Sequence, residues 1–373
     1  MEIGFDAKRA YNNAAGLGNF SRNAISALSG QFPDDRYFLF HPGSKKPLFV
    51  APENATEVQP ENFWWKSLKS AWRTYQISSL VRKLKLDLYH GLSHELPVGI
   101  EKTGVKTIVT IHDLIYLRYS EFFRRMDRNI YDRKFRHACR VADRIHAISE
   151  QTKQDLITYF AVPEDKIEVI YQSINPLFFE QADALSKKKF RKKYELPEQF
   201  ILTVGTVEPR KNLLVLLEGM VASGITTPLV VVGKTTAYQQ KAEHYISKNS
   251  AVLSVQFLAG IQDTELSLIY QLADIMVYPS LFEGFGLPVA EAQASGCPVI
   301  TSNTSSLPEA GGNAAIYVNP ENREEIGRAI ESLLTDQNLR NSMISKGKLN
   351  AQRFVPELFA SQMNQLYNKV IND

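Results

Sequence analysis

Short apolar runs alternate with longer amphipathic segments along almost the whole chain. In the second half, the apolar runs fall at residues 200–204, 229–232, 255–258, 275–278, 299–301 and 315–318. The segments with helical spacing lie between them, at residues 213–222, 238–248, 265–273 and 289–295. Near-continuous apolar strands that alternate with helices predict a parallel sheet covered on both faces.

The first half shows the same alternation more loosely. Its expected strands lie at residues 3–5, 37–41, 88–90, 107–111, 144–147 and 167–170. Parallel strands are joined by right-handed crossovers, so each half predicts a doubly wound, Rossmann-like α/β domain. Such sheets bind ligands at the carboxyl ends of their strands, and we therefore expect the site in the cleft between the two domains.

Turn and linker signals put the domain boundary in the segment 173–199. Asn175-Pro176 favours a turn there, and the basic run at 187–193 is typical of a solvated helix or linker. A last helical pattern follows Pro356, after the second domain. We expect a first domain, a second domain and a final helix at residues 1–175, 176–355 and 356–373.

Composition narrows the class of protein. The 373 residues are 44% hydrophobic and 22% charged, which excludes disordered, collagen-like and coiled-coil chains. A net charge of +3 does not indicate a nucleic-acid binder. Cys139 and Cys297 are too few for a disulfide framework or a four-cysteine zinc site. Without a signal-peptide pattern or an apolar stretch of about 18 residues, the expected location is cytoplasmic.

The segment Glu283-Gly-Phe-Gly-Leu-Pro-Val-Ala-Glu291 directly follows an expected strand. Its glycines allow a sharp turn and a close backbone approach to a ligand. Pro288 suits the first turn of a helix, whose amides favour an anion such as a diphosphate. Glu291 could accept hydrogen bonds from a ribose diol, and Glu283 could touch the transferred group. The alternative is a solvated glutamate and a helix-dipole partner.

A second segment, Val204-Gly-Thr-Val-Glu-Pro-Arg-Lys-Asn212, also follows a strand. Gly205 and Thr206 form a turn, and Arg210 and Lys211 lie at the mouth of that strand. Paired cations at this position would neutralise a diphosphate and stabilise it as a leaving group. An ordinary pair of surface cations is the alternative.

The first domain contributes Gly16-Leu-Gly18 and Thr110-Ile-His-Asp-Leu114. The glycines precede a helical pattern that begins near Asn19, where backbone amides could meet a phosphate or sugar. His112 follows a strand end, from which it could donate to a sugar hydroxyl or act as acid or base. A turn histidine bonded to backbone is the alternative. Asp113 is expected to cap a helix or support His112.

Two basic segments of the first domain carry aromatic or apolar residues. Trp65, Leu68, Trp72 and Tyr75 fall at helical spacing with lysines and arginines between them. The spacing favours a helix that buries its aromatic stripe in the core and exposes its basic face to solvent. The alternative is peripheral contact with a membrane or acceptor. The stretch 118–140 is strongly basic and favours a solvated helix over a face that binds acceptor phosphate.

Together these motifs resemble the retaining glycosyltransferases of family 4, and Thr110-Ile-His-Asp-Leu114 resembles bacterial polysaccharide mannosyltransferases. The resemblance implies the GT-B fold, with two facing doubly wound domains around a central cleft. It also implies an acceptor-binding first domain, a donor-binding second domain and a final helix that crosses back onto the first. Arg210 and Lys211 match the diphosphate pair, and Glu291 matches the ribose ligand.

The resemblance carries further roles onto this sequence. The positions concerned are Gly18 for a phosphate-contacting loop, Gly205 and Thr206 for the donor turn, Ile261 for backbone contact with the base, Glu283 with the amides of Gly284, Phe285, Gly286 and Leu287 for the donor sugar and its diphosphate, and His112 for the sugar's reacting face. One departure is Asn19, where many relatives have a basic residue, which limits Gly18 to contact through backbone amides.

The expected reaction is transfer of a hexosyl group from a nucleoside diphosphate sugar to a glycan or lipid-linked acceptor. No Asp-x-Asp and no cluster with metal-ligand spacing occurs, so we expect no metal and no cofactor. GDP-mannose is the favoured donor, and UDP-glucose and UDP-N-acetylglucosamine remain open.

Three other classes remain as rivals. An NAD-dependent dehydrogenase needs a third glycine where Ser21 stands, and needs its glycines directly after the first strand. A sugar-nucleotide epimerase or phosphorylase would need no acceptor glycan. A two-lobed sugar-binding protein would bind free sugar without the nucleotide, and an export signal would be expected.

Overall fold

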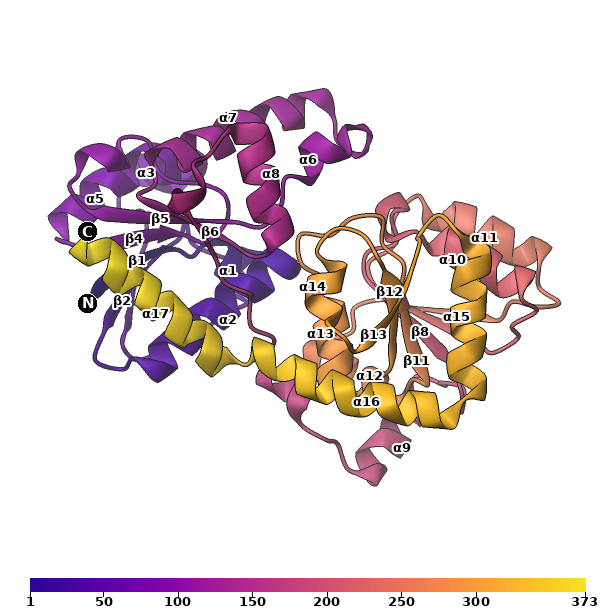
Figure 1. Cartoon of the computed structure of the whole chain (residues 1–373). Coiled ribbons are helices and arrows are strands. Elements are labelled where there is room, and N and C mark those ends of the chain that lie inside the picture. The colour runs from indigo at the N-terminus through magenta and orange to yellow at the C-terminus, as the bar shows by residue number, and fades with distance from the viewer. The chain divides into compact units, whose positions relative to one another are not determined.

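The computed structural model describes residues 1–373, which divide into two units (Figure 1). The first comprises Met1–Ser173 together with Pro356–Asp373, and the second comprises Ile174–Val355. Each unit is a parallel sheet with helices on its faces, as the apolar strand pattern predicts. No helix is long and apolar enough to cross a membrane.

The sheet of the first unit has seven strands in the order β3-β2-β1-β4-β5-β6-β7, all parallel. The strands are β1 Glu2–Asp6, β2 Arg36–Phe40, β3 Ala55–Val58, β4 Leu88–Gly91, β5 Lys106–Ile111, β6 Arg144–Ala147 and β7 Ile167–Val169. The longer helices are α2 Gly16–Gln31, α5 Ile77–Lys83, α7 Arg125–Val141, α8 Glu150–Phe160 and α17 Pro356–Asn372. The shorter ones are α1 Lys8–Asn12, α3 Phe63–Ser67, α4 Lys69–Ala71, the π-helical turn η1 Trp72–Gln76, α6 Ile115–Arg118, and the 3₁₀ turns η2 Ile100–Lys102, η3 Ser120–Phe122 and η4 Glu164–Lys166.

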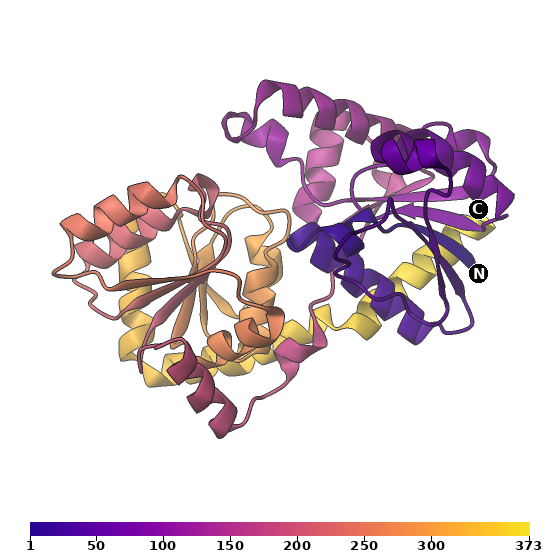
Figure 2. The ribbon, with the colours of Figure 1, turned by 180° about the vertical axis from the view of Figure 1, so that it is seen from behind.

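Two apolar cores lie on opposite faces of this sheet. One joins β1 to α2 and to the C-terminal helix α17, which run side by side (Figure 2). The other is covered by η1, α5, α7 and α8. The chain thus leaves the first unit after Ser173 and returns to it at Pro356, so that its last helix completes the core that its first helices begin.

The second unit has a six-stranded parallel sheet in the order β10-β9-β8-β11-β12-β13. Its strands are β8 Ile201–Val204, β9 Leu229–Val232, β10 Val255–Leu258, β11 Ile275–Tyr278, β12 Val299–Ser302 and β13 Ala315–Val318. Its helices are α9 Ala184–Lys193, α10 Leu213–Ala222, α11 Gln239–Lys248, α12 Asp263–Leu272, α13 Leu287–Ala294, α14 Leu307–Gly311, α15 Arg323–Thr335 and α16 Gln337–Ala351, with 3₁₀ turns η5 Pro176–Phe179, η6 Pro209–Lys211 and η7 Gln352–Phe354. Because β11 pairs with β8, the loops that follow these two central strands meet at the carboxyl end of the sheet, although they are about 70 residues apart in sequence.

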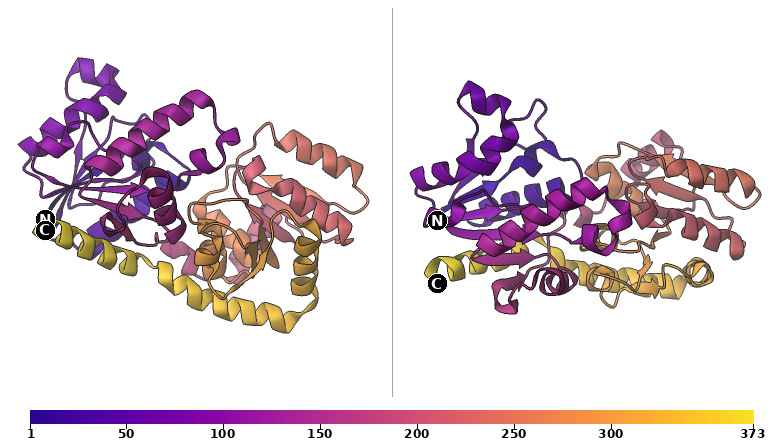
Figure 3. Two further views of the ribbon diagram at one scale, coloured as in Figure 1. Left: turned by 45° about the horizontal axis from the view of Figure 1, so that its top comes forward. Right: turned by 90° about the horizontal axis from the view of Figure 1, so that it is seen from above.

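The basic-aromatic segment is not the single buried stripe that its spacing favours. It breaks into α3, α4 and η1, and stands out from the body of the first unit (Figure 3). Trp72 is buried and Trp65 packs against the core, whereas Leu68 and Tyr75 are 55% and 64% exposed. The helix is interrupted at Leu68, whose backbone angles are not helical, and the π-helical turn then shifts the register at residues 72–76, so residues at regular spacing do not all face inward.

A hydrogen-bonded chain crosses the first core. Tyr367 of α17 donates to His90 Nδ1 at 2.8 Å, His90 Nε2 donates to Thr110 at 2.7 Å, and Thr110 donates to His146 Nδ1 at 3.0 Å. The chain ends where His146 Nε2 donates to the Ile170 carbonyl at 2.8 Å. Burial lowers the pKa of both histidines, so both are neutral, and because the Ile170 carbonyl only accepts, each hydrogen bond of the chain then has one direction. The chain ties α17 to the sheet.

We expect acid to weaken the first unit through this chain. Burial lowers the pKa of His146 to about 4, while an unfolded histidine takes its proton near pH 6.5. Stability is therefore complete above pH 6.5 and declines as the pH falls toward 4, by about 1.4 kcal/mol per pH unit for this group. Melting temperatures at pH 7 and pH 5 measure the loss. It should be smaller in His146→Gln but unchanged in the control His244→Gln, at an exposed position of α11. A loss of equal size in both variants would contradict this role.

Candidate functional site

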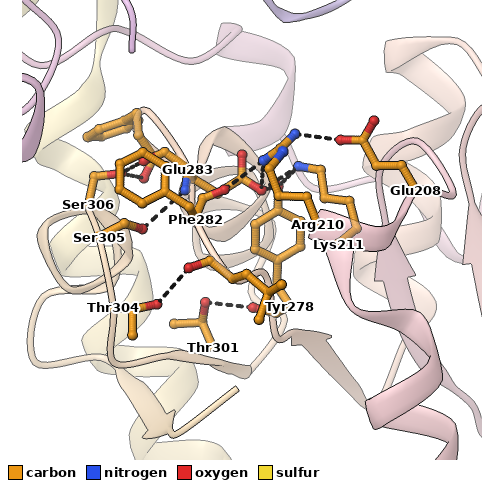
Figure 4. Close-up of polar contacts among 12 residues, drawn as sticks. Glu208, Arg210, Lys211, Tyr278, Phe282, Glu283, Thr301, Thr304, Ser305 and Ser306 are labelled. Atoms are coloured by element: carbon orange, nitrogen blue, oxygen red, sulfur yellow. Dashed lines mark hydrogen bonds and ion pairs between the residues drawn. The ribbon is translucent and has the colours of Figure 1, made fainter. Parts of the chain in front are cut away.

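Four charged side chains meet at the carboxyl ends of β8 and β11 in the second unit (Figure 4). Arg210 and Lys211 come from η6, after β8, and Glu283 comes from the loop after β11. Glu283 Oε1 lies 2.6 Å from Lys211 Nζ and 2.8 Å from Arg210 Nη1. The other terminal nitrogen of the Arg210 guanidinium, Nη2, lies 2.7 Å from Glu208 Oε1. The two motifs singled out in the sequence thus form one ion-paired cluster.

Burial and charge act against each other in this cluster. Burial alone would raise the pKa of Glu283, but the charges of Arg210 and Lys211 outweigh it and lower that pKa to about 2. Burial also lowers the pKa of Lys211, and its attraction to Glu283 offsets this only in part. The ion pairs of Glu283 with Arg210 and Lys211 and its hydrogen bond from Tyr278 all involve Oε1, and Oε2 takes part in none of them.

Glycine is needed at two turns of the site. Gly205 has φ +136°, and a Cβ there would lie 3.2 Å from Lys211 Cε, so the bare backbone lets the lysine stem pass the strand end. Gly286 has φ +109° immediately before α13, and a Cβ there would lie 2.8 Å from Leu307. Thr206 is half-buried beside Gly205.

The loop between β11 and α13 is held from the following segment. The Glu283 amide donates to Ser305 at 3.1 Å, and the Ser306 hydroxyl lies 2.9 Å from both the Glu283 and the Phe285 carbonyl (Figure 4). The Phe285 ring is buried against Phe354. Leu287 and Pro288 form the first turn of α13, so the amino end of this eight-residue helix is reached directly from the charged cluster.

Glu291 lies one turn into α13 and is 9% exposed. Burial, reinforced by the charge of Asp263, raises its pKa to about 8, and a 3.1 Å hydrogen bond from Tyr270 opposes that rise. Tyr270 donates to Oε2 of the Glu291 carboxylate, and Oε1 takes no part in this hydrogen bond. Ile261 is half-buried in the loop after β10, and no polar contact joins it to the charged cluster.

Comparison with known families decides the class. Residues 186–350 match the family model described as "Glycosyl transferases group 1", and residues 27–176 match "Glycosyltransferase Family 4". The chain belongs to the family 4 glycosyltransferases.

Individual relatives of this glycosyltransferase agree in class. It is similar to O-antigen chain mannosyltransferase B of Escherichia coli, with 29% identity over 98% of this chain and 99% of that one. It is 32% identical over 66% of its length to the serotype-specific mannosyltransferase WbdA of Escherichia coli, of which it spans 31%. Sucrose-phosphate synthase from Thermosynechococcus elongatus superposes with a TM-score of 0.77 and 20% identity, covering 100% of this chain and 99% of that one. This likeness supports the GT-B fold.

The structure shows the contacts of two first-domain residues of this glycosyltransferase, Gly18 and His112. The helix expected near Asn19 begins at Gly16, and the Gly18 amide already donates to the Ala15 carbonyl at 2.8 Å. A Cβ on Gly18 would overlap the Asn13 carbonyl, so this glycine serves close packing. Its amide is not free for the phosphate contact that the resemblance implies.

His112 is a backbone-bonded histidine. Its Nε2 donates to the Leu92 carbonyl at 2.9 Å, and burial lowers its pKa to about 3. Nδ1 therefore carries a lone pair at neutral pH, so it can accept a hydrogen bond but cannot donate one or act as an acid. Asp113 accepts from the Ile115 amide two residues on, an Asx turn that ends at Leu114, the N-cap of α6.

Sequence reasoning missed the tyrosines of this site. The Tyr278 hydroxyl accepts from Lys211 and donates to Glu283 Oε1 at 3.1 Å, and Tyr270 donates to Glu291. A polar-tipped residue closing the apolar strand β11 was the available signal for Tyr278. The residues described include no cluster of histidine, cysteine or acidic side chains that could hold a metal ion.

Proposed function

We propose that this glycosyltransferase moves a mannosyl group from GDP-mannose to a glycan or lipid-linked saccharide acceptor in cell-surface polysaccharide synthesis. We further propose that transfer retains the anomeric configuration and needs no metal. The buried pair of Arg210 and Lys211 against Glu283 is the observation that carries the proposal. Both curated relatives described above are mannosyltransferases, which supports mannose as the transferred sugar.

The chemical demand is to stabilise a departing diphosphate. The C1–O bond of the donor breaks and the diphosphate takes the electron pair. The acceptor hydroxyl attacks C1 on the same face, and its proton passes to a diphosphate oxygen. Lys211 spends two of its three N–H donors on Tyr278 and Glu283, which leaves one for that oxygen. The amino end of α13 adds positive potential where negative charge develops.

Charge balance explains why both cations are needed. Two carboxylates, Glu208 and Glu283, match Arg210 and Lys211, so the empty cluster is formally neutral. A diphosphate adds negative charge, which the fixed amide dipoles and the remaining N–H donors must balance. Glu283 Oε2 can then accept a hydroxyl of the donor sugar. On this proposal Glu283 orients both the cations and the sugar.

The nucleotide is tested by thermal shift with EDTA present, using GDP, UDP, GDP-mannose, UDP-glucose, UDP-N-acetylglucosamine, NAD and mannose. Selective stabilisation by GDP and GDP-mannose is expected. Stabilisation by UDP and one UDP-sugar instead would show that the donor is that UDP-sugar and not GDP-mannose, while the protein would still be a glycosyltransferase. A response to NAD or mannose alone would refute the roles of Arg210, Lys211 and Glu291. Proton NMR of the fresh product then reports the anomeric configuration.

Donor binding should tighten as the pH rises toward 9. A ribose diol is held best by an ionised carboxylate, and the raised pKa of Glu291, about 8, means that binding at lower pH must first expel a proton. Affinity should thus fall by up to about tenfold for each pH unit below 8. Calorimetry of GDP binding in buffers of different ionisation enthalpy measures the released proton. Glu291→Gln should abolish the release, and release that persists in this variant would place the titrating group elsewhere.

A further inference from the structure

An open groove of about 1380 Å³ lies within the first unit, apart from the charged cluster of the second. One wall is formed by η1 and the segment that follows β4, and the other is one face of α7. This volume exceeds the roughly 300–1,000 Å³ of ordinary small-molecule pockets, so a single sugar would leave most of it empty. An elongated ligand fits the space better.

Positive charge is left over inside the groove. Of its carboxylates, Asp6 is paired with Arg73, and Glu95 is paired with Arg73 and Lys134. Glu101 remains as the single lining carboxylate without an ion pair. The lining cations that no carboxylate neutralises are Arg133, Arg140 and Lys166.

The α7 face orders these charges along the groove. Arg133 and Arg140 are seven residues apart, about 10 Å along a helix, and project on the same side. His137 lies between them, and its Nε2 is buried without a hydrogen-bond partner. Lys166 donates to the Arg140 carbonyl at 3.0 Å, which keeps its ammonium at this end of the groove. A ligand with several acceptor oxygens would satisfy these donors.

The opposite wall carries an apolar strip beside the ion-paired Arg73 and Glu95. Leu96 and Val98 line the groove together with Tyr75, which is 64% exposed. The segment that leads into η1 exposes Phe63 and Trp64 at 77% and 74%. An apolar strip on one wall of a groove, with cations on the other, is typical of surfaces that receive an amphipathic anion.

We propose that this groove binds a lipid diphosphate, with the diphosphate on Arg133, Arg140 and Lys166 and the hydrocarbon chain along the wall of Tyr75, Leu96 and Val98. The inference rests on the proposed function, since such a lipid would be the carrier of a lipid-linked acceptor. Cations inside a concave groove can contact the head group of a single lipid molecule. Cations that contact a flat bilayer would instead lie on a convex surface of the protein. The three free cations, less the unpaired carboxylate of Glu101, leave two positive charges in the groove to attract a diphosphate.

The test uses the full chain and farnesyl diphosphate as a soluble probe, with saturating GDP present to occupy the donor site. Inorganic pyrophosphate supplies the charge without the chain. Arg133→Glu/Arg140→Glu reverses the charge of the groove, and Arg125→Glu is the matched control on an exposed position of α7 outside it. Thermal unfolding of each variant checks the fold. Sedimentation with phosphatidylcholine–phosphatidylglycerol vesicles tests bilayer contact separately.

Farnesyl diphosphate should bind at least about tenfold tighter than pyrophosphate, and the double variant should lose at least about tenfold while Arg125→Glu loses none. Equal affinity for the two probes would overturn the proposal. So would an affinity for farnesyl diphosphate that is the same in the double variant as in the unchanged protein. Vesicle binding without binding of farnesyl diphosphate would also overturn it, in favour of a bilayer surface. GDP binding is measured on the same samples, so a failure of the donor assignment is seen independently of the groove.

Discussion

Lys211→Ala should lower kcat by about 10²–10³-fold while the protein stays folded. Removing one preorganised donor to a developing negative charge costs this much in comparable sites. The ammonium lies 2.6 Å from Glu283 and is the only lysine of the cluster, so no neighbouring lysine can replace it. The measurement is single-turnover transfer from the donor identified by thermal shift, with kcat and KM determined separately.

Lys241→Ala is the matched control for this experiment. Lys241 is an exposed lysine of α11 in the same unit, far from β8 in the sequence. It should leave kcat unchanged. If Lys211→Ala raised KM alone and kept kcat, the lysine would bind the donor without stabilising its departure, and the proposed role would be wrong.

Arg73→Ala should destabilise the first unit by about 3–5 kcal/mol. Arg73 is 10% exposed and bridges the buried Asp6 carboxylate at 3.0 Å and Glu95 at 2.7 Å. Removing one partner of a buried pair leaves an uncompensated charge in the interior, which costs far more than the intact pair contributes. Hydrogen exchange of the β1 and β4 amides measures the loss within this unit.

Arg36→Ala gives the comparison. Its partner is Glu2 on the same sheet, but the arginine side chain is 72% exposed, so the expected loss is under about 1 kcal/mol. Equal losses in the two variants would show that burial does not govern these pairs. A loss for Arg73→Ala confined to η1 would show that the bridge holds only that turn.

Most strands were predictable because parallel strands buried on both faces consist of continuous apolar residues. The run at 275–278 is β11 itself. The strand β3, Ala55–Val58, was not predicted, since it is a short edge strand with Thr56 and Glu57 exposed and carries no apolar periodicity. The interruptions of the helix at residues 63–83 were not predicted either, because neither the non-helical backbone of Leu68 nor the π-helical turn changes the spacing of apolar residues in the sequence.

Site residues were identifiable where chemistry and spacing coincide. Arg210, Lys211 and Glu283 stand out because charged residues directly follow apolar strands. Tyr278 did not stand out, since a tyrosine that closes a buried strand is ordinary in composition. The sequence left His112 open between a sugar contact and a backbone-bonded histidine and did not indicate the close packing of Gly18, because the partners of their N–H groups, the Leu92 and Ala15 carbonyls, are set by the folded backbone.

The sequence by itself determined the alternation of strands and helices, the two-domain α/β class and the residue types that a diphosphate site requires. Only the tertiary structure decided which of these residues meet. Strand β8 lies between β9, which follows it in sequence, and β11, which does not, so Lys211 and Glu283, 72 residues apart, become an ion pair. Strand order depends on crossovers and core packing spread over the whole domain, and no local pattern encodes it.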